Sequence, residues 1–124
     1  MKIYNNIGDL RDLKYPVVTT GGFDGVHIGH MKILNRMASI AKENNGESLV
    51  FTFHPHPRLV LFPDSKIQIL TTEKEKIELL EKAKIDNLLI YPFTKEFSNL
   101  TSEKFIRNIL AEKLKAKKLI LFLQ

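Results

Sequence analysis

Cysteine is absent from this sequence of 124 residues, and its absence excludes several kinds of chemistry. Without thiols the chain cannot form a disulfide scaffold, use a thiolate nucleophile or build a cysteine-based zinc site. A cysteine-free chain fits a reducing compartment, and the N-terminal residues lack the apolar run of a signal peptide, so we expect a cytoplasmic protein. Apolar runs long enough to cross a bilayer are also missing, and no membrane partner is expected.

Charge of one sign is not in large excess either, because the sequence has 19 basic and 14 acidic residues and a net charge of +5. Many lysines alternate with glutamates, as in residues 73–76, which is typical of a solvated helix face. We therefore expect no nucleic-acid partner and favour a small polyanionic ligand. The length, with 44% hydrophobic and 27% charged residues, indicates one globular domain over residues 1–124.

Short apolar segments alternate with amphipathic segments along the chain. Runs of β-branched and apolar residues predict strands, and apolar residues that recur at spacings of three and four residues predict helices. The loop that we expect at residues 54–70 holds three of the five prolines, and long loops in compact domains are usually functional. The expected strands are residues 16–20, 48–53, 87–91 and 118–123. Three helices are expected: one over about residues 29–44, a second that begins at Thr72, and a third that begins at Thr101 or Ser102.

This order of elements predicts an α/β fold, a Rossmann-like three-layer sandwich with a parallel sheet. Such sheets bind ligands at the carboxyl ends of their strands, near the point where the strand order reverses. Residues 21–30 and 54–58 are both unusual in composition, and each segment directly follows an expected strand. We therefore expect the two segments to meet at one edge of the sheet.

The segment at residues 21–30 has the composition of a phosphate-binding turn. Its glycines allow a tight turn and close approach of a ligand. It leads into a helix, whose first N–H groups and dipole attract anions. The candidate nucleotide-binding residues are Gly21, Gly22, Phe23, Asp24, Gly25, His27, Gly29 and His30.

Two histidines in this segment are candidates for contact with phosphate. His27 and His30 are three residues apart, so on a first helical turn they share a face and can donate hydrogen bonds to phosphate oxygens. A zinc site formed with His54 and His56 is the alternative. No neighbouring cluster of carboxylates or thiols supports it, so we expect no metal held by the protein.

Residues 21–30, Gly-Gly-Phe-Asp-Gly-Val-His-Ile-Gly-His, resemble the signature of the HxGH nucleotidylyltransferases. The Phe-Asp-Gly-Val-His form is similar to the adenylyltransferase module of prokaryotic FAD synthetases, the bifunctional riboflavin kinase/FMN adenylyltransferases. Residues 51–58 resemble the Phe-Asp-Pro-His-Pro-Arg loop of that family. Residues 70–80, 91–97 and 103–105 resemble segments that follow it in the same order, so the similarity runs from about residue 15 to residue 120.

The sequence also departs from the family pattern. Gly22 stands where Asn or Thr is frequent, and His54 stands where Asp is common. The family continues with a glycine-rich segment, a Ser/Thr/Arg-rich phosphate motif and a riboflavin kinase domain. We therefore expect residues 1–124 to form an adenylyltransferase domain that is incomplete at its C-terminus, without the kinase domain. With the family's strand order 3-2-1-4-5, residues 119–123 would form an apolar edge open to self-association.

The resemblance implies the reaction of ATP with FMN to give FAD and pyrophosphate, with Mg²⁺ accompanying ATP. It makes His27 and His30 the catalytic residues. It places Phe53, Pro55, His56, Pro57 and Arg58 on the flavin side. Two alternatives stay open: a non-catalytic remnant that binds nucleotide or flavin, and another HxGH transferase such as a cytidylyltransferase.

Overall fold

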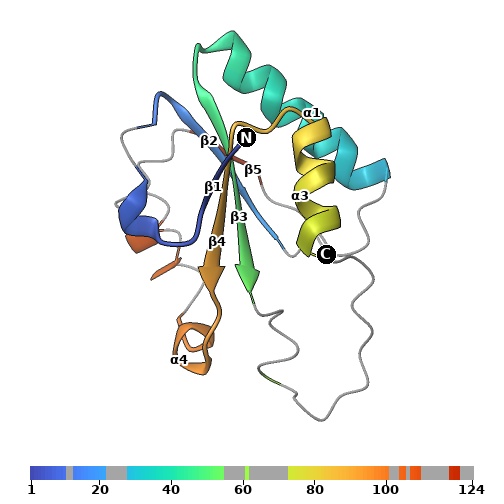
Figure 1. The fold of residues 1–124 in the computed structure, drawn as a ribbon. Helices are drawn as coiled ribbons and strands as arrows, with labels where there is room; N and C mark the ends of the chain where they lie inside the picture. The colour runs from blue at the N-terminus through green and yellow to red at the C-terminus, as the bar shows by residue number, and fades with distance from the viewer. Residues whose placement is uncertain are drawn as a thin grey trace.

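The computed structural model describes residues 1–10, 13–21, 28–54, 61, 73–100, 104–105, 107–109 and 118–120. Strands and helices alternate through most of this part of the chain (Figure 1). The elements are β1 (Lys2–Tyr4), the short 3₁₀ helix η1 (Ile7–Asp9), β2 (Pro16–Thr20), α1 (Ile28–Glu43), β3 (Glu47–His54), α3 (Glu73–Lys82), β4 (Asn87–Pro92), α4 (Lys95–Ser98) and β5 (Lys118–Ile120).

The strands form one parallel sheet in the order β1-β4-β3-β2-β5. The predicted α/β fold with a parallel sheet is confirmed, and the four expected strands lie in the expected relative order. The sequence interpretation missed β1, which adds a fifth strand beside β4 and pairs Lys2 with Asn87. Strand order reverses at β2, which lies between β3 and β5.

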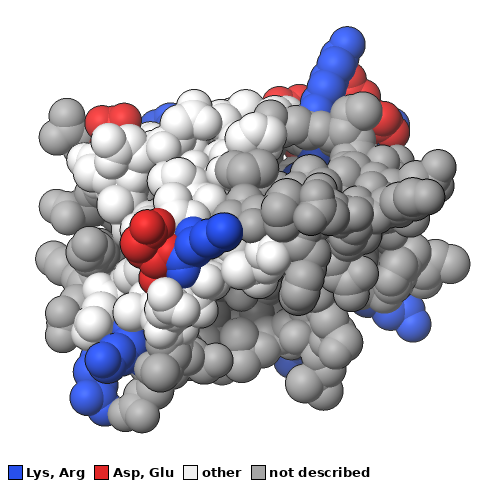
Figure 2. All heavy atoms as spheres, turned by 90° about the horizontal axis from the view of Figure 1, so that it is seen from below, with Lys and Arg blue, Asp and Glu red and all other residues white. Residues whose placement is uncertain are grey.

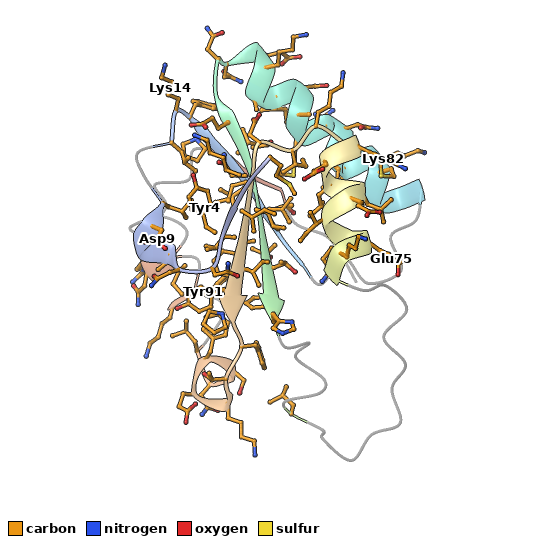
Figure 3. The ribbon with its side chains drawn as sticks, in the orientation of Figure 1. Tyr4, Asp9, Lys14, Glu75, Lys82 and Tyr91 are labelled. Carbon is orange, nitrogen blue, oxygen red and sulfur yellow. The ribbon has the colours of Figure 1, made fainter. Side chains whose placement is uncertain are left out.

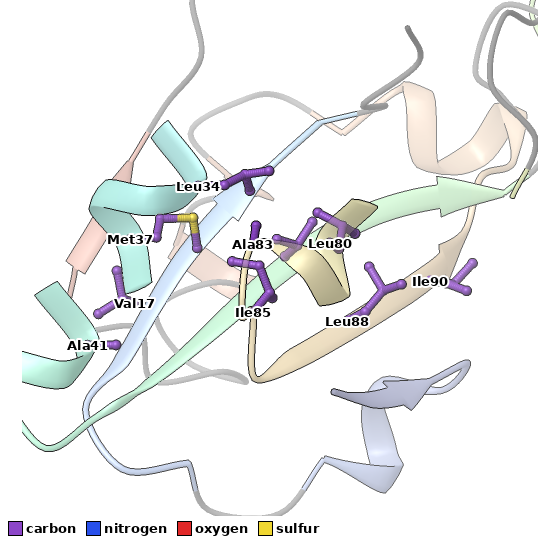
Figure 4. Packing of buried hydrophobic residues seen from close by; sticks show 10 residues of the cluster. Val17, Leu34, Met37, Ala41, Leu80, Ala83, Ile85, Leu88 and Ile90 are labelled. Carbon is purple, nitrogen blue, oxygen red and sulfur yellow. The ribbon is translucent and has the colours of Figure 1, made fainter. Parts of the chain in front are cut away.

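Helices α1 and α3 cover one face of the sheet (Figure 1). In α1 the buried positions Leu34, Met37 and Ala41 are spaced at three and four residues, so one stripe of the helix faces the sheet. Figure 4 shows how the side chains of both helices meet those of the central strands. The buried members of this first cluster are Val17, Leu34, Met37, Ala41, Val50, Leu80, Ala83, Ile85, Leu88 and Ile90.

The opposite face of the sheet carries a second, more aromatic core. Tyr4 and Tyr91 lie on this side, away from α3 with its Glu75 and Lys82 (Figure 3). Residues 104–105 and 107–109 are helical and supply Phe105 and Ile109 to this core, as expected for the last predicted helix. Its buried members are Val18, Leu49, Phe51, Leu89 and Ile109. No helix in the described ranges is long and apolar enough to span a membrane.

A polar network ties the amino ends of β3 and β4 together. The Asp86 carboxylate accepts hydrogen bonds from the Ser48 backbone N–H at 2.9 Å and from the Ser48 hydroxyl at 3.2 Å. The side-chain amide of Asn87 donates to the Ser48 carbonyl at 3.1 Å. The backbone N–H of Lys2 donates to the Asp86 carbonyl at 2.9 Å, so Asp86 also connects β1 to this network.

Helices α1 and α3 end in the same way, on a residue with a left-handed backbone. Asn45 follows α1 with φ 52°, and Lys84 follows α3 with φ 61°. The next N–H in each case bonds back into the last turn, from Gly46 to the Ala41 carbonyl at 2.6 Å and from Ile85 to the Leu80 carbonyl at 3.2 Å. This is the Schellman type of helix end, in which glycine is the favoured left-handed residue.

Replacing Lys84 with glycine should therefore stabilise the protein by about 0.5–1 kcal/mol, because glycine adopts positive φ without the Cβ penalty. Lys84 is exposed, so little packing is lost. Chemical denaturation monitored by circular dichroism measures the change. The matched control is Asn45→Gly, which should gain less because asparagine tolerates this conformation. A lower stability for Lys84→Gly would contradict the assignment of strain to this residue.

Candidate functional site

The candidate site lies at the carboxyl edge of the sheet. Strands β2 and β3 are neighbours, and Gly21, directly after β2, donates its backbone N–H to the Phe51 carbonyl at 3.0 Å. His54 ends β3 opposite Pro92, and its carbonyl accepts from the Phe93 N–H at 3.2 Å. The two unusual sequence segments thus both start at this edge. Their remaining residues up to the start of α1 and beyond His54 lie outside the described ranges, so the meeting of the two segments stays a prediction.

Helix α1 starts at this same edge, because it follows β2 and begins at Ile28. It has 16 residues, and the backbone of Gly29 and His30 lies in its first turn. The amino end of a helix of this length presents unpaired N–H groups and a partial positive charge, which favour a bound phosphate. The described backbone therefore supplies the strand and the helix between which the sequence predicts a phosphate-binding turn.

Most of the predicted nucleotide-binding residues lie outside the described part of the chain. This holds for Gly22, Phe23, Asp24, Gly25 and His27, and for the side chain of His30. Gly21 is described and directly follows β2. The assignment of nucleotide contacts to these residues, and of catalysis to the histidines, stays a prediction.

On the flavin side, Phe53 is the predicted residue that the structure describes, while residues 55–58 lie outside the described ranges. Its ring is half-buried and contacts Phe51 and Phe93 edge-on, with centroids 5.4 Å and 5.6 Å away. It also contacts Phe97 at 5.5 Å. Phe53 thus packs on the second core at the carboxyl edge. Its contact with flavin stays a prediction, as do those of Pro55, His56, Pro57 and Arg58.

The sequence interpretation missed an aromatic cluster around Phe53. Tyr91 stacks on Phe51 with centroids 5.2 Å apart, and Phe97 contacts the rings of both Tyr91 and Phe105. Phe97 comes from α4, whose first turn is capped by Thr94, since the Thr94 hydroxyl accepts the Phe97 N–H at 3.0 Å. A pattern in the sequence could have predicted this cluster. Aromatic residues stand at alternating positions of two strands, and side chains at alternating positions share one face of a sheet.

The described charged side chains do not gather on this edge. Figure 2 shows the molecule from the side of the carboxyl ends of β3 and β4. Among the described residues visible in this view, Lys, Arg, Asp and Glu are scattered and form no single cluster. Within the described ranges no group of three His, Asp or Glu side chains could hold a metal ion. Residues 27 and 56 and the side chain of residue 30 are outside those ranges, so the predicted absence of a protein-held metal stays a prediction.

A solved structure with a similar fold is a macrolide-efflux protein from Streptococcus pneumoniae. It superimposes with a TM-score of 0.82 over 96% of this chain and 46% of its own, at 23% sequence identity. At this identity the similarity concerns the fold. It agrees with the α/β fold and parallel sheet described above.

The family model described as FAD synthetase matches residues 10–121, and the chain belongs to this family. A bifunctional riboflavin kinase/FMN adenylyltransferase from Buchnera aphidicola subsp. Schizaphis graminum is 38% identical over 98% of this chain. Proteins of the same description from Listeria monocytogenes and Escherichia coli are 36% and 33% identical over 76% and 82% of the chain. The chain spans 39% of the length of the Buchnera protein and about a third of the others.

Proposed function

We propose that this chain is an FMN adenylyltransferase, which transfers the adenylyl group of ATP to FMN and releases pyrophosphate. The observation that carries the proposal is the match to the FAD synthetase family over residues 10–121. The match includes the glycine–histidine segment, and that segment joins β2 to α1 at the carboxyl edge of the sheet. A helix amino end at this position suits the triphosphate of ATP.

In this reaction a phosphate oxygen of FMN attacks the α-phosphorus of ATP in line, and pyrophosphate leaves. A phosphate monoester is already an anion near neutral pH, so the attack needs no general base. The protein's contribution is to position the two substrates and to stabilise the charge of the transition state. We assign this stabilisation to His27 and His30, through hydrogen bonds to the phosphate oxygens. Mg²⁺ bound to ATP would neutralise phosphate charge, and we propose no protein ligand for it.

The flavin would lie beside the loop after β3. Arg58 is the proposed phosphate partner there, since a guanidinium donates paired hydrogen bonds to phosphate. Phe53, Pro55, His56 and Pro57 would shape this side of the site. The ring centroids of Phe51, Phe93 and Phe97 lie 5.4, 5.6 and 5.5 Å from that of Phe53, so the Phe53 ring packs against three aromatic neighbours at the edge of the sheet.

FAD formation by the 124-residue chain, measured by chromatography with ATP, Mg²⁺ and FMN, tests this proposal. Product formation would support it. Binding of ATP or FMN in calorimetry without turnover would replace it with a non-catalytic binding role. Binding of CTP in preference to ATP would favour a cytidylyltransferase instead. A chain that binds no nucleotide would contradict the proposal.

We also propose a cytoplasmic location and self-association through β5. In the described part of the sheet, β5 pairs with β2 alone and forms one edge. A parallel edge strand presents unpaired N–H and C=O groups to another strand. Sedimentation velocity of the 124-residue chain should show a dimer whose fraction of the total protein increases with protein concentration. A single monomeric species at high concentration would contradict self-association.

A further inference from the structure

Asn45 and Gly46 form an asparagine–glycine pair directly after α1, and Asn45 is exposed. Of the asparagines in the sequence, Asn45 alone is followed by glycine. The side-chain amide of an asparagine can be attacked by the backbone nitrogen of the next residue, and glycine permits this attack most readily because it has no side chain in the way. Spontaneous deamidation of this chain is therefore chemically easiest at Asn45.

The helix end holds the attacking nitrogen in a hydrogen bond. Asn45 has a left-handed backbone with φ 52°, and the Gly46 N–H donates to the Ala41 carbonyl at 2.6 Å. The attack requires the Gly46 nitrogen to lose its proton, and this proton is engaged by the Ala41 carbonyl. The closed helix end therefore opposes the first step of the reaction.

Contacts with the residues before β2 restrain the same peptide. The Glu47 N–H donates to the Lys14 carbonyl at 2.8 Å, and the Lys14 N–H donates to the Glu47 carboxylate at 3.0 Å. A Cβ atom on Gly46 would lie 2.5 Å from the Tyr15 carbonyl oxygen, so the glycine backbone packs directly on Tyr15. To turn toward the Asn45 side chain, the peptide has to break these contacts.

We propose that Asn45 is a deamidation site whose reaction requires this corner of the fold to open. In the open state the Gly46 nitrogen loses its proton and bonds to the side-chain carbonyl carbon of Asn45, while the side-chain nitrogen takes up a proton and leaves as ammonia. Water then opens the succinimide ring at one of its two carbonyl groups and gives aspartate or isoaspartate. Isoaspartate lengthens the main chain, so the hydrogen bonds of Gly46 and Glu47 lose their register and the corner does not close again.

Incubation of the 124-residue chain in mildly alkaline buffer, with and without guanidinium chloride, tests the proposal. Peptide mass spectrometry should show deamidation at Asn45 about tenfold or more slower in the folded chain than in the unfolded chain. Hydrogen exchange followed by NMR should show the Gly46 N–H protected in the folded chain, because the same opening exposes it to water and frees it for attack.

Two variants separate the site from the opening that controls it. Asn45→Lys removes the reactive amide and places at this position the residue type that α3 has at Lys84, so the peptide should show no deamidation. Glu47→Ala removes the carboxylate that accepts the Lys14 N–H. It should raise the rate in the folded chain about threefold and leave the rate in the unfolded chain unchanged. Melting temperatures show that each variant is folded during the incubation.

Three results would overturn the proposal. Equal rates in the folded and unfolded chains would mean that the corner does not restrain the reaction. Deamidation that persists in the same peptide of Asn45→Lys would assign the reaction to another residue. Faster exchange of the Gly46 N–H in Glu47→Ala without faster deamidation would separate the reaction from the opening.

Discussion

Replacing His30 with alanine should lower the rate of FAD formation by about a hundredfold or more, the usual cost of losing a preorganised hydrogen-bond donor to a transition state. The backbone of His30 lies in the first turn of α1, where the helix dipole already favours phosphate. We expect the same effect for His27→Ala. Because the imidazole would act mainly as charge builds on the phosphates, kcat should fall more than KM rises.

The measurement is steady-state FAD formation with ATP and FMN varied in turn. The matched control is Asn35→Ala, which removes a polar side chain from an exposed position of the same helix and should leave the rate unchanged. Melting temperatures of all the variants show whether a loss of rate reflects unfolding. An unchanged kcat in both histidine variants would remove these residues from the mechanism.

Truncating Phe51 to alanine should destabilise the protein by about 3–5 kcal/mol, which is a large part of the stability of a small domain. Phe51 is fully buried in the central strand β3 and contacts the rings of Phe53, Tyr91 and Phe105. Its loss would leave a cavity between three aromatic rings, because the close-packed surroundings relax only partly to fill such a space. Urea denaturation followed by circular dichroism measures the loss.

The comparison variant is Phe51→Leu, which keeps most of the buried volume and should lose well under half as much stability. Both variants should also lower affinity for FMN if Phe53 contacts the flavin, because Phe51 supports the Phe53 ring. A stability change below about 1 kcal/mol for Phe51→Ala would mean that the cluster repacks, and that it does not hold Phe53 in place.

Strong local patterns in the sequence predicted the main frame of the fold. The β-branched run before Gly21 predicted β2 with the bounds that the structure has, and the spacing of Leu34, Met37 and Ala41 predicted α1 to within about one residue. The weak elements were missed. β1 has three residues, and its apolar Ile3 is 42% exposed, so neither length nor periodicity marks it. Its pairing depends on β4, which is remote in sequence.

α4 was missed for a different reason. It has four residues and a single turn, too short for periodicity, although the capping Thr94 with Glu96 in the first turn was a usable pattern. For the candidate site, the sequence predicted which strand ends meet. It did not predict the aromatic cluster, because its rings meet only through the pairing of β3 with β4 and the packing of α4 and Phe105 against these strands.

The position of β1 has a consequence for how the chain acquires its fold. β1 is synthesised before its hydrogen-bonding partner β4, which lies about 85 residues later by the pairing of Lys2 with Asn87. The unit β2–α1–β3 is contiguous and can assemble while β1 has nothing to pair with. During translation β1 can pair only after Asp86, which accepts its first hydrogen bond, and β4 have been synthesised. Contacts of such long sequence separation are slow to form, so docking of β1 should be a late event in folding.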